Sequence, residues 1–342
     1  MRLSKELTSL VSTSLASPTG LNGVGPEAPL YLRADDAIDL HLHTYASDGF
    51  WDPTALVSYL AEHGFRVGAV SDHDTQDSVI EAIEAGRRRG VRIIPATEVT
   101  VRWGDRQWHL LVYGIRPDDE REEAKPFLDL MRDQDARFRA LAVDSRRRVE
   151  ASGRPLPSID NQVNGRTMMP VHVLRAMIAD KHVPSLKEAA ELVVALGSHF
   201  TTDSPLADVV EAAHQGGGVC VLAHPGRADL GPALDAEVLD RILADTPLDG
   251  IECHYRTYTD ADTTFYRGLA EARRLVIGTG SDSHAPGAPV DPRPWRAIWA
   301  AGLLGRLGIM VEPVADGPIW EHGMDALAAK PEPAKEPAAV EA

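Results

Sequence analysis

The sequence predicts an α/β protein built on a parallel sheet with helices outside it. Two observations support this fold class: short apolar runs alternate with helical segments, and Gly, Pro or Asp residues separate them. A third is that several apolar runs lead directly into His, Asp or Glu, as in folds where the chemistry gathers at the carboxyl ends of parallel strands. With 342 residues, of which 44% are apolar, the chain has room for one barrel with an insertion.

The first predicted strands are joined by helices with recognisable ends. Asp52 is a typical N-cap and Pro53 a typical first residue of a helix that ends near Gly64. A second helix is expected from about Asp77 to a stop at Gly90. The strands around them are predicted at residues 37–40, 67–70, 91–94 and 108–113, with Glu98 following the third.

A charged helical stretch then interrupts the alternation. Phe127, Leu128 and Met131 form its apolar stripe, and a loop is expected at 155–165. Helices at 172–179 and 185–196 follow, the second opening with a capping box. We expect residues 119–204 to be a helical insertion over the barrel mouth.

The alternation resumes after the insertion. Helices are predicted at 205–214, 236–243 and 263–273, and strands at 219–222, 250–254 and 275–278. The terminal segments are rich in Ser, Gly and Pro or in Pro, Ala, Glu and Lys, which favours disorder. The predicted divisions are an N-terminal arm (1–35), a first barrel part (36–118), the insertion (119–204), a second barrel part (205–325) and a disordered tail (326–342).

Composition limits the possible partners and location. The net charge of −16 argues against binding long nucleic acids through a basic surface, so a phosphate site would need metals or a few arginines. Cys220 and Cys253 lie in apolar runs and are expected to be reduced, packed thiols. No apolar stretch approaches the roughly 20 residues of a membrane span, and no signal peptide is recognisable. We therefore expect a cytoplasmic location without a membrane partner; the oligomeric state stays open.

His41 and His43 stand where the first strand ends. Alternate side chains of a strand point to the same face, so both imidazoles can bind one metal ion. Alone, such a pair is as easily a surface feature, but the pattern recurs along the chain. The N and O donors at or beside strand ends are His41, His43, Asp48, His73, Glu98, His109, His224, His254, Asp282 and His284. They suffice for two or three divalent ions, and the absence of a thiolate favours a catalytic site over a structural zinc site.

The segments that carry these residues resemble the motifs of the PHP (polymerase and histidinol phosphatase) superfamily. They read Asp-Leu-His-Leu-His with Ser-Asp-Gly, Ser-Asp-His-Asp-Thr, Glu98, Leu-Ala-His-Pro-Gly-Arg, and Gly-Ser-Asp-Ser-His, and the similarity spans about 37–290. The helical insertion is similar to that of the subgroup acting on nucleotides and short RNA. The resemblance implies a distorted, TIM-like (β/α)7 barrel, two or three Mn, Fe or Zn ions, and hydrolysis of phosphate monoesters.

The resemblance also implies how the ligands would be shared. Many members have a histidine where Asp48 stands, which leaves the third ion open. The implied sets are His41, His43, Glu98 and Asp282 for the first ion, Glu98, His109 and His224 for the second, and Asp48, His73 and His284 for the third.

The expected reaction is attack on the phosphorus by a metal-bound hydroxide held by Glu98, His224 and Asp282. Arg227, with its fork of donors, is expected to bind a phosphate oxygen. His172 in the insertion is a further candidate for substrate binding.

Other residues near the motifs are open to two interpretations. His254 is extra to the family pattern and is also a candidate for substrate binding. Asp72 or Asp74 is expected to orient a metal-bound His73. Tyr255 and Tyr258 can either stack on a base or only pack.

The expected substrates are AMP, 3′,5′-bisphosphate nucleotides or similar small phosphorylated metabolites. Histidinol-phosphate phosphatase is an alternative that the long insertion disfavours. A 5′→3′ exonuclease on short RNA is compatible with an acidic surface. A non-enzymatic metal-binding regulatory module is the third alternative, which metal analysis of the purified protein would separate from an enzyme.

Overall fold

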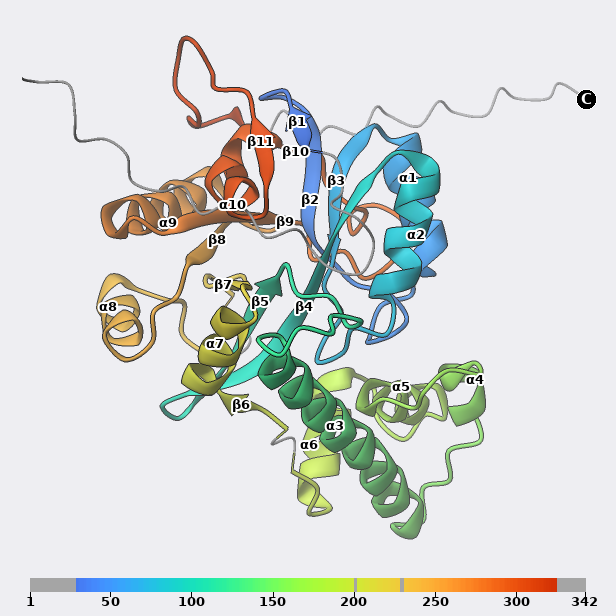
Figure 1. Ribbon diagram of the computed structural model, residues 1–342. Coiled ribbons are helices and arrows are strands. Elements are labelled where there is room, and N and C mark those ends of the chain that lie inside the picture. Colours follow the sequence, from blue (N-terminus) through green and yellow to red (C-terminus); the bar gives the residue numbers. More distant parts are fainter. Residues whose placement is uncertain (1–28, 200–201, 228–230, 325–342) are drawn as a thin grey trace, which may run out of the picture.

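The computed structural model describes residues 29–199, 202–227 and 231–324 (Figure 1). Its centre is one mixed sheet in the order β10-β2-β3-β4-β5-β7-β8-β9, with β6 paired to β4. The strands are β2 (Ala37–Leu42), β3 (Phe65–Val70), β4 (Arg92–Trp103), β5 (Arg106–Tyr113), β6 (Ser204–Pro205), β7 (Val219–Leu222), β8 (Gly250–Tyr255), β9 (Val276–Gly280) and β10 (Trp295–Arg296).

The two ends of this sheet meet, so that it forms a nearly closed barrel. The backbone N–H of Asp282, just after β9, donates to the carbonyl of His41 over 2.9 Å, and that of His43 donates to the carbonyl of Ser283 over 2.9 Å. These bonds join the segment after β9 to β2 and leave neither strand as an open edge there. The predicted distorted, TIM-like α/β barrel is confirmed.

The alternation of strands and helices predicted a parallel sheet, but the observed sheet is mixed. β4 and β5 form an antiparallel hairpin, and β5 is also antiparallel to β7. The reason is the short Gly104-Asp105 turn, since so short a connection can only join antiparallel strands. β4 is also longer than predicted, and Glu98 therefore lies in the middle of a strand instead of after one.

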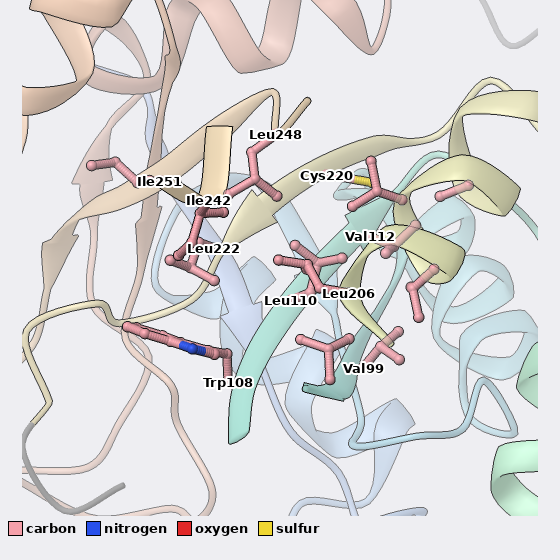
Figure 2. Packing of buried hydrophobic residues seen from close by; sticks show 14 of the residues in the cluster. Val99, Trp108, Leu110, Val112, Leu206, Cys220, Leu222, Ile242, Leu248 and Ile251 are labelled. Atoms are coloured by element: carbon pink, nitrogen blue, oxygen red, sulfur yellow. The ribbon is translucent and has the colours of Figure 1, made fainter. Parts of the chain in front are cut away.

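Helices cover the outside of the barrel at the predicted places. They are α1 (Pro53–Glu62), α2 (Val79–Arg89), α7 (Leu206–Gln215), α8 (Ala236–Asp245) and α9 (Asp260–Arg273). The Asp52 side chain caps α1 by accepting a 2.9 Å bond from the N–H of Ala55, and Gly90 ends α2 with φ +75°. Figure 2 shows how Leu206 of α7 and Ile242 of α8 pack on Leu110, Val112 and Leu222 of the sheet.

Three predictions about the remaining segments need correction. The predicted arm 1–35 includes β1 (Leu30–Leu32), which pairs with β11 (Ile309–Val311). The predicted loop at 155–165 contains the short helix α4 (Ile159–Val163). No element was predicted after 284, yet the structure has η1 (Ala297–Ala300) and α10 (Ala301–Arg306) there. Their apolar side chains pack in one cluster with buried side chains of the barrel strands. The rest of the arm, 1–28, and the predicted tail lie outside the described residues.

Helices α3 (Lys125–Ala151), α4, α5 (Pro170–Ala179) and α6 (Leu186–Ala195) lie between β5 and β6 in the chain. In Figure 1 they form a group at one end of the sheet, with a core of their own that includes Val149, Val173 and Val193. α3 is long but strongly charged, and none of the helices described is long and apolar enough to cross a membrane.

Gln134 ties α3 to the barrel. Its side chain is fully buried, and its Nε2 donates to Asp74 Oδ1 over 2.6 Å and to the carbonyl of Thr100 over 2.8 Å. Its Oε1 accepts from the Ser204 hydroxyl over 2.5 Å. One side chain thus joins the insertion helix to β4, to β6 and to the loop after β3.

Replacing Gln134 by Ala should lower the free energy of unfolding by about 2 kcal/mol, because it leaves buried donors and acceptors without partners. Urea unfolding followed by circular dichroism measures this. The exposed Gln215→Ala on α7 is the matched control and should change the free energy by less than about 0.5 kcal/mol. Equal effects of the two substitutions would contradict the anchoring role.

Candidate metal centre

The structure brings together nine side chains from six segments at one end of the barrel. Most stand at or just after the carboxyl ends of strands, whereas Glu98 and His109 come from within β4 and β5. We call this set the cup; its members are His41, His43, Asp48, His73, Glu98, His109, His224, Asp282 and His284.

Glu98 lies at the centre of the cup and is fully buried. Its Oε1 is 2.9 Å from His109 Nδ1 and 2.8 Å from His224 Nε2. Its Oε2 is 2.9 Å from His41 Nε2, 3.1 Å from His43 Nε2 and 3.4 Å from His73 Nδ1. The two carboxylate oxygens therefore face different imidazoles, which is the arrangement of a bridging carboxylate.

Asp48 and Asp282 complete the cup on the side away from β5. Asp282 Oδ1 is 3.0 Å from His43 Nε2 and 3.5 Å from His41 Nε2. Asp48 Oδ1 is 3.0 Å from His284 Nε2 and 3.9 Å from His73 Nε2. Three overlapping groups, centred on Glu98, Asp282 and Asp48, thus share the available N and O atoms.

Two cup residues have left-handed backbones, which is uncommon for residues other than glycine. Asp282 has φ +54° and His224 has φ +26°. A backbone hydrogen bond holds each of them in place. The N–H of Asp282 donates to the carbonyl of His41, and the N–H of His224 donates to Glu252 Oε2 over 2.7 Å. Barrel closure for Asp282, and the bond to the neighbouring strand β8 for His224, therefore hold these two residues in the cup against a local conformational cost.

The carboxylates of the cup are held in their charged form. Burial works against ionisation, but the imidazoles of His41, His73 and His109 bring the pKa of Glu98 well below its usual range. The pKa of Asp282 is lowered in the same way, against burial, by His41 and His43. Burial also disfavours a positive His43, yet its bonds to Asp282 and Glu98 raise its pKa to about 10. Without another cation, protons must balance these carboxylates.

Comparison with known proteins identifies relatives of the chain. It is 30% identical over 288 residues to the 5′-3′ exoribonuclease Rnm of Salmonella typhimurium, covering 78% of this chain and 91% of that protein. It is 28% identical over 260 residues to the 3′,5′-nucleoside bisphosphate phosphatase of Chromobacterium violaceum, covering 73% of this chain and 88% of that protein. No family model matches the sequence.

A solved structure described as a metal-dependent phosphoesterase from Bifidobacterium adolescentis superposes with a TM-score of 0.63 and 26% identity, over 79% of this chain and 96% of that one. The protein belongs to the PHP superfamily. This PHP protein is a phosphoesterase, a hydrolase that acts on phosphoric ester bonds.

The cup of this PHP phosphoesterase is chemically suited to divalent ions. Its donors are imidazole nitrogens and carboxylate oxygens, a set that binds Mn, Fe and Zn. His41 Nε2 and His43 Nε2 are only 3.1 Å apart, so a proton or a cation must stand between them or beside them. Asp282 Oδ1 is buried and faces His43 Nε2 and His41 Nε2 at 3.0 and 3.5 Å, as expected of an oxygen that would share a cation with them.

Of the predicted substrate contacts, Arg227 lies at the cup, with its Nη1 3.3 Å from Asp282 Oδ2. His172 lies at the start of α5, where its Nδ1 accepts a 3.0 Å bond from the N–H of Met169. Its Nε2 is buried and without a hydrogen-bond partner among the described residues. Burial, with Arg166 and Arg175 nearby, lowers the pKa of His172 to about 4, so it is neutral at pH 7.

The prediction that His254 contacts substrate is wrong. Its ring is fully buried and stacks on Trp299, with the centroids 4.6 Å apart, and its Nε2 is 3.0 Å from Arg267 Nη1. A register shift between Glu252 and His254 breaks the alternation of β8, so His254 points out of the barrel while Glu252 points in.

The expected roles of the acids beside His73 are also corrected. Asp72 accepts bonds from the N–H and hydroxyl of Thr44 over 2.7 and 2.6 Å, and so orders the loop after β2. Asp74 binds the N–H and hydroxyl of Thr100 over 2.7 and 2.6 Å. Both carboxylates therefore hold loops instead of orienting the His73 ring.

The two tyrosines hold the cup instead of standing free to stack on a base. The Tyr255 hydroxyl donates to Asp282 Oδ2 over 2.7 Å, and Tyr258 accepts the N–H of Gly226 over 2.5 Å. The residue that sequence reasoning missed is Glu252, which contacts His41 and His224. The sequence carries a signal for it, since Gly-Ile-Glu-Cys-His has an acid at a predicted strand end.

The pKa of His43 makes the metal-free protein sensitive to alkaline pH. A group whose pKa rises from 6.5 to about 10 on folding stabilises the protein below pH 6.5, and this stabilisation is lost as the pH rises towards 10. In EDTA, the Tm should therefore fall by at least about 3 °C between roughly pH 6.5 and pH 10.

With saturating Mn²⁺ the fall should be smaller, because a cation replaces the protons. Differential scanning fluorimetry at several pH values measures both series, and other alkaline effects common to the two cancel in the comparison. Identical pH profiles with EDTA and with Mn²⁺ would contradict the electrostatic description of the cup.

Proposed function

We propose that this protein hydrolyses phosphate monoesters of nucleotides with two or three divalent ions bound in the cup. The proposal rests mainly on Glu98, whose two carboxylate oxygens face different sets of imidazoles. In support of the proposal, relatives include a nucleoside bisphosphate phosphatase and exoribonucleases, all acting on phosphoric esters of nucleotides.

The first two of the three proposed ligand sets share Glu98. A first ion would be held by the group around Asp282, a second by Glu98 with two histidines, and a third by the group around Asp48. The sets are His41, His43, Glu98 and Asp282; Glu98, His109 and His224; and Asp48, His73 and His284.

Bound divalent ions would lower the pKa of a water and neutralise charge on the phosphoryl oxygens. The residues of the chain supply the rest. Through the bound ions, Glu98, His224 and Asp282 would hold the attacking water near the phosphorus. Arg227, 3.3 Å from Asp282 Oδ2 and one-third exposed, can turn its guanidinium to a phosphate oxygen at the cup.

A cavity beside the cup supports a nucleoside as the rest of the substrate. It measures about 190 Å³ and lies between the loop after β2 and the insertion helices. Ser47, Asp48 and His73 form its wall on the cup side, and the opposite wall is apolar, made by Phe138, Met169, Pro170, Val171 and Leu174. A phosphate in the cup would place an attached base against this apolar wall.

Two arginines of the insertion favour substrates with a second negative group. Arg175 Nη2 donates to the backbone carbonyl of Asp48 over 2.6 Å, and Arg166 Nη1 donates to that of Tyr45 over 3.3 Å. Within the described part of the chain, neither guanidinium forms an ion pair with a carboxylate. Two such cations beside Asp48 and the loop after β2 would attract a second phosphate.

A second candidate is 5′→3′ exonuclease action on short RNA, which the exoribonuclease relatives favour. The two candidates differ in the bond that is broken. Phosphate release from mononucleotides supports the phosphatase, whereas release of mononucleotides from 5′-phosphorylated oligonucleotides of a few residues supports the exonuclease.

Replacing His43 by Ala should lower kcat/KM for AMP or adenosine 3′,5′-bisphosphate by about 1000-fold in Mn²⁺, because the ion loses a ligand. Phosphate release measures the rate, and metal analysis of the same protein measures the stoichiometry. His63→Ala, on the exposed end of α1, is the matched control. Phosphate release at the wild-type rate by His43→Ala would refute the site.

Replacing Phe138 by Ala should raise KM for AMP by about 10-fold and leave kcat nearly unchanged, because it removes apolar contact made equally in ground and transition states. Ribose 5-phosphate, which lacks a base, should be unaffected by the substitution. Phe265→Ala, at an exposed position of α9, serves as the control variant. If the substitution raises KM by the same factor for AMP and for ribose 5-phosphate, the base does not bind in this cavity.

A further inference from the structure

Glu252 of β8 lies behind the cup and is completely buried. Its Oε1 is 3.1 Å from His41 Nδ1, on the side of the ring opposite to the Nε2 that faces Glu98. Its Oε2 accepts a 2.7 Å bond from the backbone N–H of His224. One carboxylate therefore supports two members of the cup without facing the centre of the cup itself.

The neighbouring strand leaves room for this contact at Gly280. A Cβ at position 280 would collide with the Cβ of His41 and with Glu252 Oε1. Any side chain there would push the carboxylate and the imidazole apart. The pair is thus built by three strands: β2 provides His41, β8 provides Glu252, and β9 provides the space.

We propose that Glu252 is a positioning residue that keeps a proton on His41 Nδ1 and so leaves Nε2 to bind a cation. This inference rests on the metal-dependent function proposed above. An imidazole binds a metal through a nitrogen without a proton, and a carboxylate on the other nitrogen fixes which one that is.

The contacts of Glu252 fit a proton on His41 Nδ1. Oε2 accepts the N–H of His224, which can only donate. Both oxygens of a carboxylate accept, so Oε1 pairs with a His41 Nδ1 that donates. The same bond to His224 secures the left-handed turn at φ +26° that brings its ring to Glu98.

A glutamine at 252 cannot serve both neighbours, although it has the same shape. If its oxygen accepts from His224, its amide group faces His41 Nδ1 and the imidazole proton must move to Nε2. If its oxygen faces His41 instead, two N–H groups oppose each other at His224. The first arrangement blocks the nitrogen that faces the cup, and the second disturbs the turn.

The test compares Glu252→Gln with the wild type and with Glu271→Gln, which removes the same charge from an exposed position of α9. The Kd for Mn²⁺ is measured from free Mn²⁺ by electron paramagnetic resonance. Glu252→Gln should weaken binding by about 10–100-fold, and Glu271→Gln should not change it. Wild-type affinity in a folded Glu252→Gln would overturn the inference while the proposed function stands.

A second readout does not depend on metal. In metal-free protein labelled with ¹⁵N-histidine, assigned with His41→Asn, the neutral form of the His41 ring should carry its one proton on Nδ1. A bare Nδ1 in the wild type would overturn the inference even if Glu252→Gln does not fold. If the wild type binds no Mn²⁺, the proposed function fails, and this measurement still decides whether Glu252 holds the proton.

Discussion

The structure depends on the hydrogen bonds that close the barrel between β2 and the segment after β9. Those bonds place His41 and His43 beside Asp282 and Ser283, residues about 240 positions later in the chain. They also hold Asp282 at positive φ, so that a residue that would otherwise prefer an extended backbone points into the cup. If the sheet stayed open, the charges of the cup would be spread over an edge instead of gathered at one end.

Gathering these charges is costly, and the fold offsets the cost locally. Burial alone would neutralise the carboxylates of the cup, yet the imidazoles around them keep the pKa of Glu98 and of Asp282 well below the usual range. The backbone around the cup is held by other buried acids. Asp39, whose pKa burial raises to about 7, accepts the N–H groups of Ser281 and Arg293, and Asp72 accepts the N–H of Thr44 in the loop after β2. These two acids thus fix the backbone on which the cup residues stand.

Much of this arrangement could be predicted because it depends on local rules. The helix start at Asp52, the helix end at Gly90 and the position of His41 and His43 on one face of a strand follow from capping and from the two-residue period of strands. The convergence of distant motifs followed from the rule that chemistry collects at strand ends. Asp48 follows this rule as well, since its carboxylate lies 3.0 Å from His284 Nε2.

What could not be predicted depends on irregular backbone. The register shift in β8 exchanges the faces of its last residues, so Glu252 and Tyr255 support the cup and His254 joins a group of tryptophans. A strict alternation would have put Glu252 and His254 on the same face, and the residue between them is not a glycine that would signal the shift.

The hairpin of β4 and β5 likewise moves Glu98 into the middle of a strand, where it can reach imidazoles on both sides. The position that joins the ligand groups is therefore set by an antiparallel pair inside a largely parallel barrel. That pair also orders the start of the insertion, since Gln134 binds the carbonyl of Thr100, two residues after Glu98. The central carboxylate and the helices beside the cavity are consequently held by the same strand, so a shift of β4 would move Glu98 and one wall of the cavity together.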